Sequence, residues 1–293
     1  MVARLPRVAP GRYRVVKPPA ALAHRAGHAW EQARLPFVSA DLIYCPANLA
    51  PIASRRNVVV IHDLAAVRHP EWYSRPYVAW QRAVLPRIAR RARLVITVSD
   101  FSRREIEDVL GVTATVIPNG VGERFKPSDG KGEYALVVGT RIARKNLAAL
   151  TAAARALREH GIELVSAGSG RGYMRAGESP VRELGYVPED DLPSLYARAR
   201  VLLMPSLYEG FGLPCVEAMA SGTPVVAANR GALPETCGDA ALVVEPDELA
   251  EAAVAAATTE AERLTEAGLS RAARFTWERT ARETDQAIGR LLT

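Results

Sequence analysis

Residues Val201–Glu217 read VLLMPSLYEGFGLPCVE and carry the clearest signal of the architecture. The first four of these residues are apolar, which is typical of a buried strand. A turn with two glycines follows, and Pro214 fits the first position of a helix, where its missing N–H group costs nothing. A buried strand that leads through a glycine turn into a helix is the repeating unit of parallel α/β proteins, so we predict that architecture here.

The same alternation of short apolar runs and helical patterns extends over almost the whole chain, which favours parallel sheets throughout. Ser99 or Ser102 is a suitable N-cap for one of the helices. We predict strands at residues 41–45, 57–61, 94–98, 115–117, 134–138, 163–167, 201–204, 224–227 and 241–243. We predict helices at residues 77–91, 102–110, 146–160, 192–199, 214–220 and 248–267.

A polar, turn-rich segment at residues 125–132 (FKPSDGKG) separates the two halves of this pattern. We therefore expect an N-terminal domain at residues 1–126, a C-terminal domain at 127–276 and a final helix at 277–293 that packs back toward the first domain. Two open parallel sheets in tandem bind ligands at the carboxyl ends of their strands, which would face each other across a cleft.

Composition and cysteine usage indicate a cytoplasmic globular protein. Of the 293 residues, 48% are hydrophobic and 24% charged. No apolar run approaches the roughly 20 residues that span a bilayer, and the N-terminus lacks the apolar core of a signal peptide. The three cysteines, Cys45, Cys215 and Cys237, are far apart in the sequence, which argues against a disulfide framework and against a zinc site.

Charge is unevenly distributed along the chain. Lys and Arg outnumber Asp and Glu by 19 to 9 in residues 1–125 and are outnumbered by 23 to 19 in residues 126–293. Such a basic half suits a phosphorylated acceptor, a lipid headgroup at the inner face of the cell membrane, or nucleic acid. It also suits a merely solvated arginine-rich surface. No aromatic–basic module accompanies the charge, so we expect no nucleic-acid partner.

The first candidate site is the segment GTRIARKN at residues 139–146, which follows the predicted strand 134–138 and opens a helix. A strand-to-helix turn presents unpaired backbone N–H groups and the positive end of a helix dipole. Arg141 and Lys145 add positive charge at the same place, and Gly139 begins the turn. These groups suit a diphosphate, although a solvated basic loop would look the same in isolation.

The second candidate site is the turn after Met204. Gly210 and Gly212 let the backbone approach a ligand closely. Glu209 and Glu217 bracket the turn, and their carboxylates can accept hydrogen bonds from sugar and ribose hydroxyls. A glutamate in the first turn of a helix can also be only a partner of the helix dipole, so both interpretations of Glu217 stay open.

These motifs together resemble the retaining glycosyltransferases of family 4, which have the GT-B fold of two Rossmann-like domains facing a cleft. The resemblance covers roughly residues 40–290, and the pair of glutamates with the preceding arginine and lysine is its most specific part. It rests on the segments 57–63 (NVVVIHD), 96–102 (ITVSDFS), 116–121 (VIPNGV), 139–146, 205–220 and 275–278 (FTWE).

The resemblance implies a role for each matching residue. Arg141 and Lys145 match the basic pair that holds the donor diphosphate, Glu209 the glutamate near the donor sugar, and Glu217 the glutamate that binds the ribose. His62 matches a histidine that faces the donor sugar from the first domain. The expected catalytic residues are His62, Arg141, Lys145 and Glu209. The expected donor-binding residues are Gly139, Arg141, Lys145, Gly185, Val187, Glu209, Gly210, Phe211, Gly212, Leu213 and Glu217.

The resemblance also implies a substrate class. The segment HDL with the later HPEW at His69–Trp72 is similar to bacterial mannosyltransferases that build polysaccharide or glycolipid. We expect transfer of a hexose, with mannose favoured, from a nucleotide-diphosphate sugar such as GDP-mannose to a glycan or lipid-linked acceptor. No metal is expected, because the chain has no D-x-D-like motif after an early strand.

The N-terminus departs from the family pattern. Members normally open with a strand, a glycine-rich turn and a helix, whereas this chain opens MVARLPRVAPGRYRVVKPP. We therefore expect an incomplete first domain, through a start assigned too far downstream or through loss of part of the acceptor domain. The alternative function is a non-catalytic donor-binding or scaffold subunit that needs a partner to complete that domain. An incomplete sheet would expose an edge strand and apolar surface.

Overall fold

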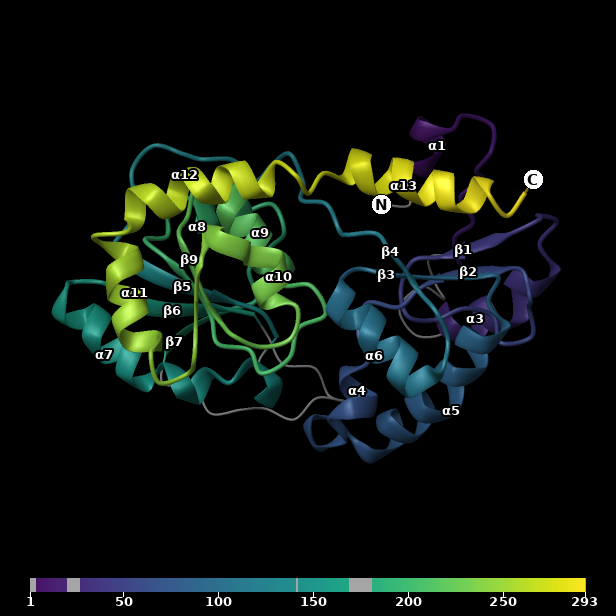
Figure 1. Cartoon of the computed structure of the whole chain (residues 1–293), viewed down its shortest axis with the longest axis horizontal. Coiled ribbons are helices and arrows are strands. Elements are labelled where there is room, and N and C mark those ends of the chain that lie inside the picture. The colour runs from purple at the N-terminus through teal and green to yellow at the C-terminus, as the bar shows by residue number, and fades with distance from the viewer. Residues whose placement is uncertain (1–3, 20–26, 141, 169–180, 293) are drawn as a thin grey trace. The chain divides into compact units, whose positions relative to one another are not determined.

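The computed structural model describes residues 4–19, 27–140, 142–168 and 181–292 of the chain. By its contacts the chain divides into two compact units (Figure 1). Unit 1 comprises residues 1–68, 75–120 and 277–293, and unit 2 comprises residues 69–74 and 121–276. The chain thus passes between the units near residues 68, 74, 120 and 276.

Unit 1 is built on a four-stranded parallel sheet in the order β1-β2-β3-β4. The strands are short, and their residues are largely buried except in the last strand, where Thr115 is exposed. They are β1 (Ile43–Cys45), β2 (Asn57–Val60), β3 (Leu94–Thr97) and β4 (Thr115–Val116).

Helices cover both faces of this sheet. Alternate strand residues face opposite sides, so Val59 and Val95 pack on α5 and α6, whereas Val60 and Ile96 line a cavity beside α13. Ser99 is the N-cap of α6, since its Oγ accepts the Ser102 N–H at 3.0 Å, one of the two predicted caps. The helices of unit 1 are α1 (Leu5–Val8), α3 (Gly27–Arg34), α4 (Ala65–Arg68), α5 (Arg75–Arg91), α6 (Asp100–Leu110) and α13 (Trp277–Gly289), with the 3-10 turn η1 (Leu35–Phe37).

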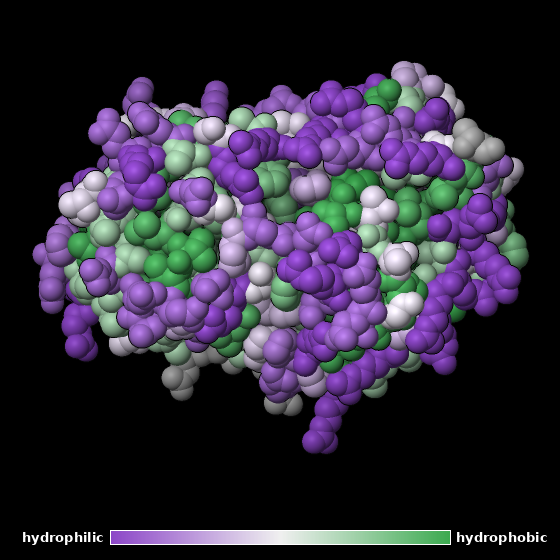
Figure 2. All heavy atoms as spheres, in the orientation of Figure 1, coloured by the Kyte–Doolittle hydropathy of each residue, from purple (hydrophilic) through white to green (hydrophobic). Residues whose placement is uncertain are grey.

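Strand β1 ends the sheet among the residues that the structure describes. A cavity of about 720 Å³ runs beside it, and its lining includes Val15, Val16 and Leu292, all more than a third exposed. Figure 2 shows apolar side chains gathered below α13, over the sheet of unit 1. This agrees with the expected apolar surface beside an edge strand.

Unit 2 contains a six-stranded parallel sheet in the order β10-β9-β8-β5-β6-β7. Strands β5 and β8 are neighbours in the middle, so the two candidate segments that follow them start side by side. The strands are β5 (Tyr134–Val138), β6 (Glu163–Ala167), β7 (Arg182–Gly185), β8 (Leu202–Met204), β9 (Val225–Ala228) and β10 (Leu242–Val244).

The helices of unit 2 follow the strands, as expected for parallel connections. Helices α7 and α11 pack together over one face, and their small alanines allow close approach to the sheet. The helices are α7 (Thr151–Glu159), α8 (Leu192–Arg198), α9 (Leu213–Ala220), α10 (Leu233–Cys237), α11 (Leu249–Ala257) and α12 (Ala261–Ala272). The 3-10 turns are η2 (Pro70–Trp72), η3 (Ala143–Lys145), η4 (Leu147–Leu150) and η5 (Gly238–Ala240).

Two helix predictions were wrong, and one strand was missed together with the short helices α1, α3, α4 and α10. The predicted helix 146–160 begins as η4, because Asn146 has a left-handed backbone (φ 51°) and cannot open an α-helix. The predicted helix 248–267 is two helices, separated at Thr258, whose hydroxyl donates to the Val254 carbonyl. Strand β7 was not predicted, since its residues, RELG, form no apolar run at the edge of the sheet.

Candidate functional site

The carboxyl ends of three neighbouring strands in unit 2 meet at glycines. Gly139 follows β5, and its N–H donates to the Ala167 carbonyl at 2.9 Å. Gly168 follows β6, and its N–H donates to the Gly185 carbonyl at 2.8 Å. A Cβ at Gly168 would lie 1.8 Å from the Gly139 oxygen, so only glycine permits this contact.

Lys145 and Glu209 form a buried ion pair at the ends of β5 and β8. Lys145 Nζ lies 2.9 Å from Glu209 Oε1, and the two side chains are only 7% and 9% exposed. Gly139 makes room for the lysine, because a Cβ there would lie 2.6 Å from Lys145 Cε. Two residues predicted for one site are therefore in direct contact.

Arg144 is a third member of this cluster. Its Nη1 lies 3.6 Å from Glu209 Oε2 and donates to the Tyr208 carbonyl at 3.1 Å. Burial would raise the pKa of Glu209, but the nearby positive charges of Lys145 and Arg144 outweigh it, and the pKa lies below its ordinary value. Glu209 is thus an ionised carboxylate between two cations, and the cluster retains net positive charge.

The sequence prediction missed Arg144, although its position beside Lys145 in a basic turn was a usable signal. The prediction named Arg141 instead, which lies outside the described residues.

The turn from Gly210 to Leu213 is closely packed, and Gly210, Phe211 and Gly212 are all buried. The Phe211 ring is buried and meets Phe275 edge-on at 5.4 Å. Gly212 has φ 89°, and a Cβ there would lie 2.7 Å from Leu233 Cδ2. Leu213 begins α9. The predicted contribution of this segment to ligand binding would therefore come from its backbone.

Glu217 is held separately, on α9. Its Oε2 accepts the hydroxyl proton of Tyr196 on α8 at 2.9 Å. Burial raises the pKa of Glu217 to about 7, and the hydrogen bond from Tyr196 opposes part of that rise. Gly185 and Val187, both expected to bind the donor, lie at the end of β7, where Gly185 has φ 72° and Val187 is half-buried.

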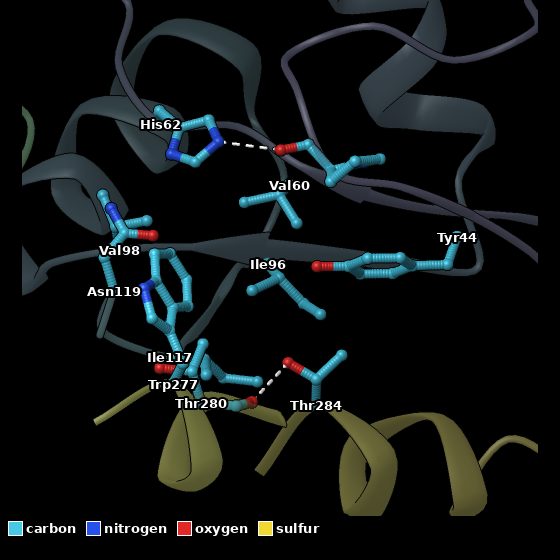
Figure 3. Close-up of a pocket in the computed structure, with 11 residues that line it drawn as sticks. Tyr44, Val60, His62, Ile96, Val98, Ile117, Asn119, Trp277, Thr280 and Thr284 are labelled. Atoms are coloured by element: carbon cyan, nitrogen blue, oxygen red, sulfur yellow. Dashed lines mark hydrogen bonds between the residues drawn. The ribbon is translucent and has the colours of Figure 1, made fainter. Parts of the chain in front are cut away.

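His62 lies in unit 1, just after β2. Its Nε2 lies 2.8 Å from the Pro46 carbonyl, which assigns the proton to Nε2 in the neutral ring and makes Nδ1 the acceptor (Figure 3). Its backbone is held too, because its N–H donates to Asn48 Oδ1 at 2.7 Å and its carbonyl accepts the Ser102 hydroxyl at 3.0 Å.

A cavity of about 110 Å³ lies beside His62, between the carboxyl ends of β1–β4 and α13 (Figure 3). It combines an aliphatic floor with polar groups at its rim. The lining residues are Tyr44, Pro46, Val60, His62, Ile96, Val98, Ile117, Asn119, Trp277, Thr280 and Thr284.

Two kinds of site are absent from the described ranges. No three His, Cys, Asp or Glu side chains gather there in a way that could hold a metal ion. No helix in the same ranges has the length and apolar character to cross a membrane. Cys45, Cys215 and Cys237 are all buried and unbridged.

Solved structures share this architecture. Sucrose-phosphate synthase from Thermosynechococcus elongatus is similar with a TM-score of 0.70 and 24% identity, over 86% of this chain and 74% of that one. Two parallel-sheet α/β units, one carrying a basic cluster at its strand ends, define the class: a protein of the GT-B fold.

Sequence comparison identifies the family. The model described as "Glycosyltransferase Family 4" matches residues 2–124, and "Glycosyl transferases group 1" matches residues 132–260. The O-antigen chain mannosyltransferase B of Escherichia coli is 33% identical over 290 residues, covering 84% of this chain and 74% of that protein. The MMP alpha-(1->4)-mannosyltransferase of Mycolicibacterium hassiacum is 32% identical over 275 residues, covering 82% and 64%. The chain belongs to glycosyltransferase family 4 and is a glycosyltransferase.

Proposed function

We propose that this glycosyltransferase moves a hexose, with mannose favoured, from a nucleotide-diphosphate sugar to a glycan or lipid-linked acceptor, with retention at the anomeric carbon. The observation that carries the proposal is the buried cluster of Lys145, Glu209 and Arg144. Its net positive charge lies at the carboxyl ends of β5 and β8, near the backbone of Gly139, Gly210 and Gly212, where an open parallel sheet binds ligands.

The reaction needs stabilisation of a departing diphosphate. The bond between the anomeric carbon and the phosphate oxygen breaks, and the acceptor oxygen attacks from the same face. The acceptor proton passes to the leaving phosphate. Positive charge fixed in advance where negative charge grows lowers this barrier. Lys145 and Arg141 would supply it, with Glu209 near the donor sugar, Glu217 at the ribose and His62 facing the sugar.

GDP-mannose is the favoured donor because of the two relatives, both of which are named as mannosyltransferases. UDP-glucose and UDP-N-acetylglucosamine are the next candidates. The basic first half of the chain would suit an anionic acceptor or a peripheral membrane contact.

A thermal-shift screen of nucleotide sugars tests the proposal. A ligand at 100 times its Kd stabilises the folded state by about 2.7 kcal/mol, and a weaker ligand at the same concentration stabilises it less. At equal concentrations, GDP-mannose should therefore raise Tm more than UDP sugars do. No shift with any nucleotide or nucleotide sugar would exclude donor binding. Binding without transfer to any acceptor would favour the scaffold alternative.

Chelation tests the metal-free part of the proposal. Because Lys145 and Arg141 would do the work of a cation, transfer should persist in excess EDTA. Complete loss, restored by magnesium or manganese, would overturn that part.

A further inference from the structure

A six-residue segment from the first half of the chain, His69–Ser74, belongs by its contacts to unit 2. It lies between α4 and α5 in sequence and contains η2. Trp72 and Tyr73 are 8% and 6% exposed, so the segment is packed rather than a solvated loop. The proposed function uses no residue of it, although its HPEW sequence is a feature of the resemblance.

The segment contacts the turn after β8, at Tyr208, through aromatic rings. The His69 imidazole stacks on Trp72, with ring centroids 4.1 Å apart and planes 18° apart. The same imidazole meets Tyr208 edge-on, at 5.4 Å and 68°. Both geometries are favourable for aromatic pairs. His69 Nδ1 also lies 3.1 Å from Glu71 Oε1, which orients the ring.

Tyr208 directly precedes Glu209, and the main chain around the two is fixed. The Tyr208 carbonyl accepts from Arg144 Nη1, and the Leu207 N–H donates to the Arg144 carbonyl at 2.9 Å. The Glu209 carbonyl accepts the Ala232 N–H at 2.9 Å. The His69 ring adds a restraint on the Tyr208 side chain, which is only 4% exposed.

We propose that His69, supported by Trp72, is a positioning residue that acts through Tyr208 to hold Glu209 between Lys145 and Arg144. It does not touch the reacting atoms. Misplacement of a catalytic group by about 1 Å can cost on the order of 100-fold in rate, so a restraint this close to Glu209 affects turnover. The inference rests on the proposed function, in which Glu209 contacts the donor sugar.

The test compares His69→Ala with His69→Phe in the full chain. His69→Ala should lower kcat at least fivefold and leave nucleotide affinity nearly unchanged, whereas His69→Phe keeps a flat ring and should restore most of the rate. The matched control is His28→Ala, which removes a histidine that also lies beside a tryptophan within unit 1, with its ring centroid 5.9 Å from that of Trp80. The control should match the parent.

Parent kcat in His69→Ala would overturn the proposal, and so would a His69→Phe variant no faster than His69→Ala. A double-mutant cycle with Tyr208→Leu gives a second criterion. His69→Ala should add little to Tyr208→Leu, because both act through one contact. Fully additive losses would show that His69 acts by another route.

Amide hydrogen exchange at residues 206–210 gives a readout that needs no donor sugar. Exchange there should accelerate in His69→Ala and return in His69→Phe. Unchanged exchange contradicts the inference. A parent enzyme that transfers no sugar contradicts the proposed function and leaves this measurement valid.

Discussion

At the residue scale the buried pair of Lys145 and Glu209 is the feature most sensitive to substitution. Glu209→Gln and Lys145→Met preserve shape but remove charge, and each should reduce transfer at least about tenfold, roughly 1.4 kcal/mol of barrier. Each should also lower Tm, because breaking one side of a buried ion pair costs about 3–5 kcal/mol. Steady-state kinetics and thermal unfolding measure the two effects separately.

The double variant Glu209→Gln/Lys145→Met separates stability from chemistry. It leaves fewer unpaired buried charges, so it should recover part of the lost Tm without recovering turnover. The control is Glu163→Gln, whose ion pair with Arg182 is exposed on both sides and should matter little. Near-parent turnover in the folded single variants would remove both residues from the site.

Glu217 gives the site a pH dependence near neutrality. Burial raises its pKa in the folded state to about 7, so the folded chain holds the proton more tightly than the unfolded chain does. Stability should therefore fall as pH rises from about 5 to about 8, and level off above that. A ribose bound by the carboxylate should bind more tightly over the same range. Titration calorimetry at pH 6 and 8 checks the second effect, and Glu217→Gln should abolish both trends.

The residues of this site could be predicted one by one but not as a cluster. Glycine turns and charged residues after apolar runs identified Gly139, Lys145 and Glu209, because parallel sheets bind ligands there. The ion pair itself depends on β5 and β8 being neighbours, and strand order cannot be read from local periodicity. Arg144 was missed although its place beside Lys145 was a signal in the sequence, and its approach to Glu209 depends on the folded turn.

At the element scale, sequence predicted buried elements well and exposed or interrupted ones poorly. Central strands such as β5 carry uniform apolar runs, and their bounds agree with the structure. Edge strand β7 lacks that signal because its side chains meet solvent. The break between α11 and α12 at Thr258 was hidden by the alanine-rich pattern, which favours helix on both sides.

The loop before α10 packs closely on the turn after β8, where Gly231 lies against the backbone of Glu209. The φ of Gly231 is 60°, and a Cβ there would lie 2.7 Å from the backbone carbonyl oxygen of Glu209 and 2.8 Å from its backbone nitrogen. Backbone atoms cannot rotate away as a side chain can. Gly231→Ala should therefore displace Glu209, lowering both transfer and Tm.

Gly161→Ala is the matched control for this variant. Gly161 has φ 71° with nothing within 4 Å of an added Cβ, so its replacement costs only backbone strain, on the order of 1–3 kcal/mol. Gly161→Ala should keep parent kcat. Equal kcat values in the two variants would show that the Glu209 backbone is not constrained by Gly231.

At the scale of the whole molecule, α13 ties the end of the chain to unit 1. Thr280 Oγ1 donates to the Pro118 carbonyl at 2.8 Å, and Asp285 Oδ1 accepts from both Arg12 and Tyr13 at 2.7 Å. Its inner face is buried at Ala281, Thr284 and Ile288 and covers one side of the β1–β4 sheet. The helical spacing of small and apolar residues from residue 277 predicted the helix, whereas its partners in the N-terminal segment had no signal in the sequence.

Truncation after Thr276 should separate the tasks of the two units. The cut keeps the Val121–Thr276 bridge and the Phe211–Phe275 contact, which belong to unit 2, so nucleotide affinity should stay within a fewfold of the parent. It removes the cover of the unit 1 sheet on the side of the His62 cavity, so transfer should be lost. A shorter truncation after Gly289 keeps all of α13 and should retain activity.

Calorimetry with the nucleotide and a separate turnover assay distinguish the effect on nucleotide affinity from the effect on transfer. Transfer at the parent rate by the protein cut after Thr276 would show that α13 is dispensable, and loss of nucleotide binding would show that unit 2 depends on it as well.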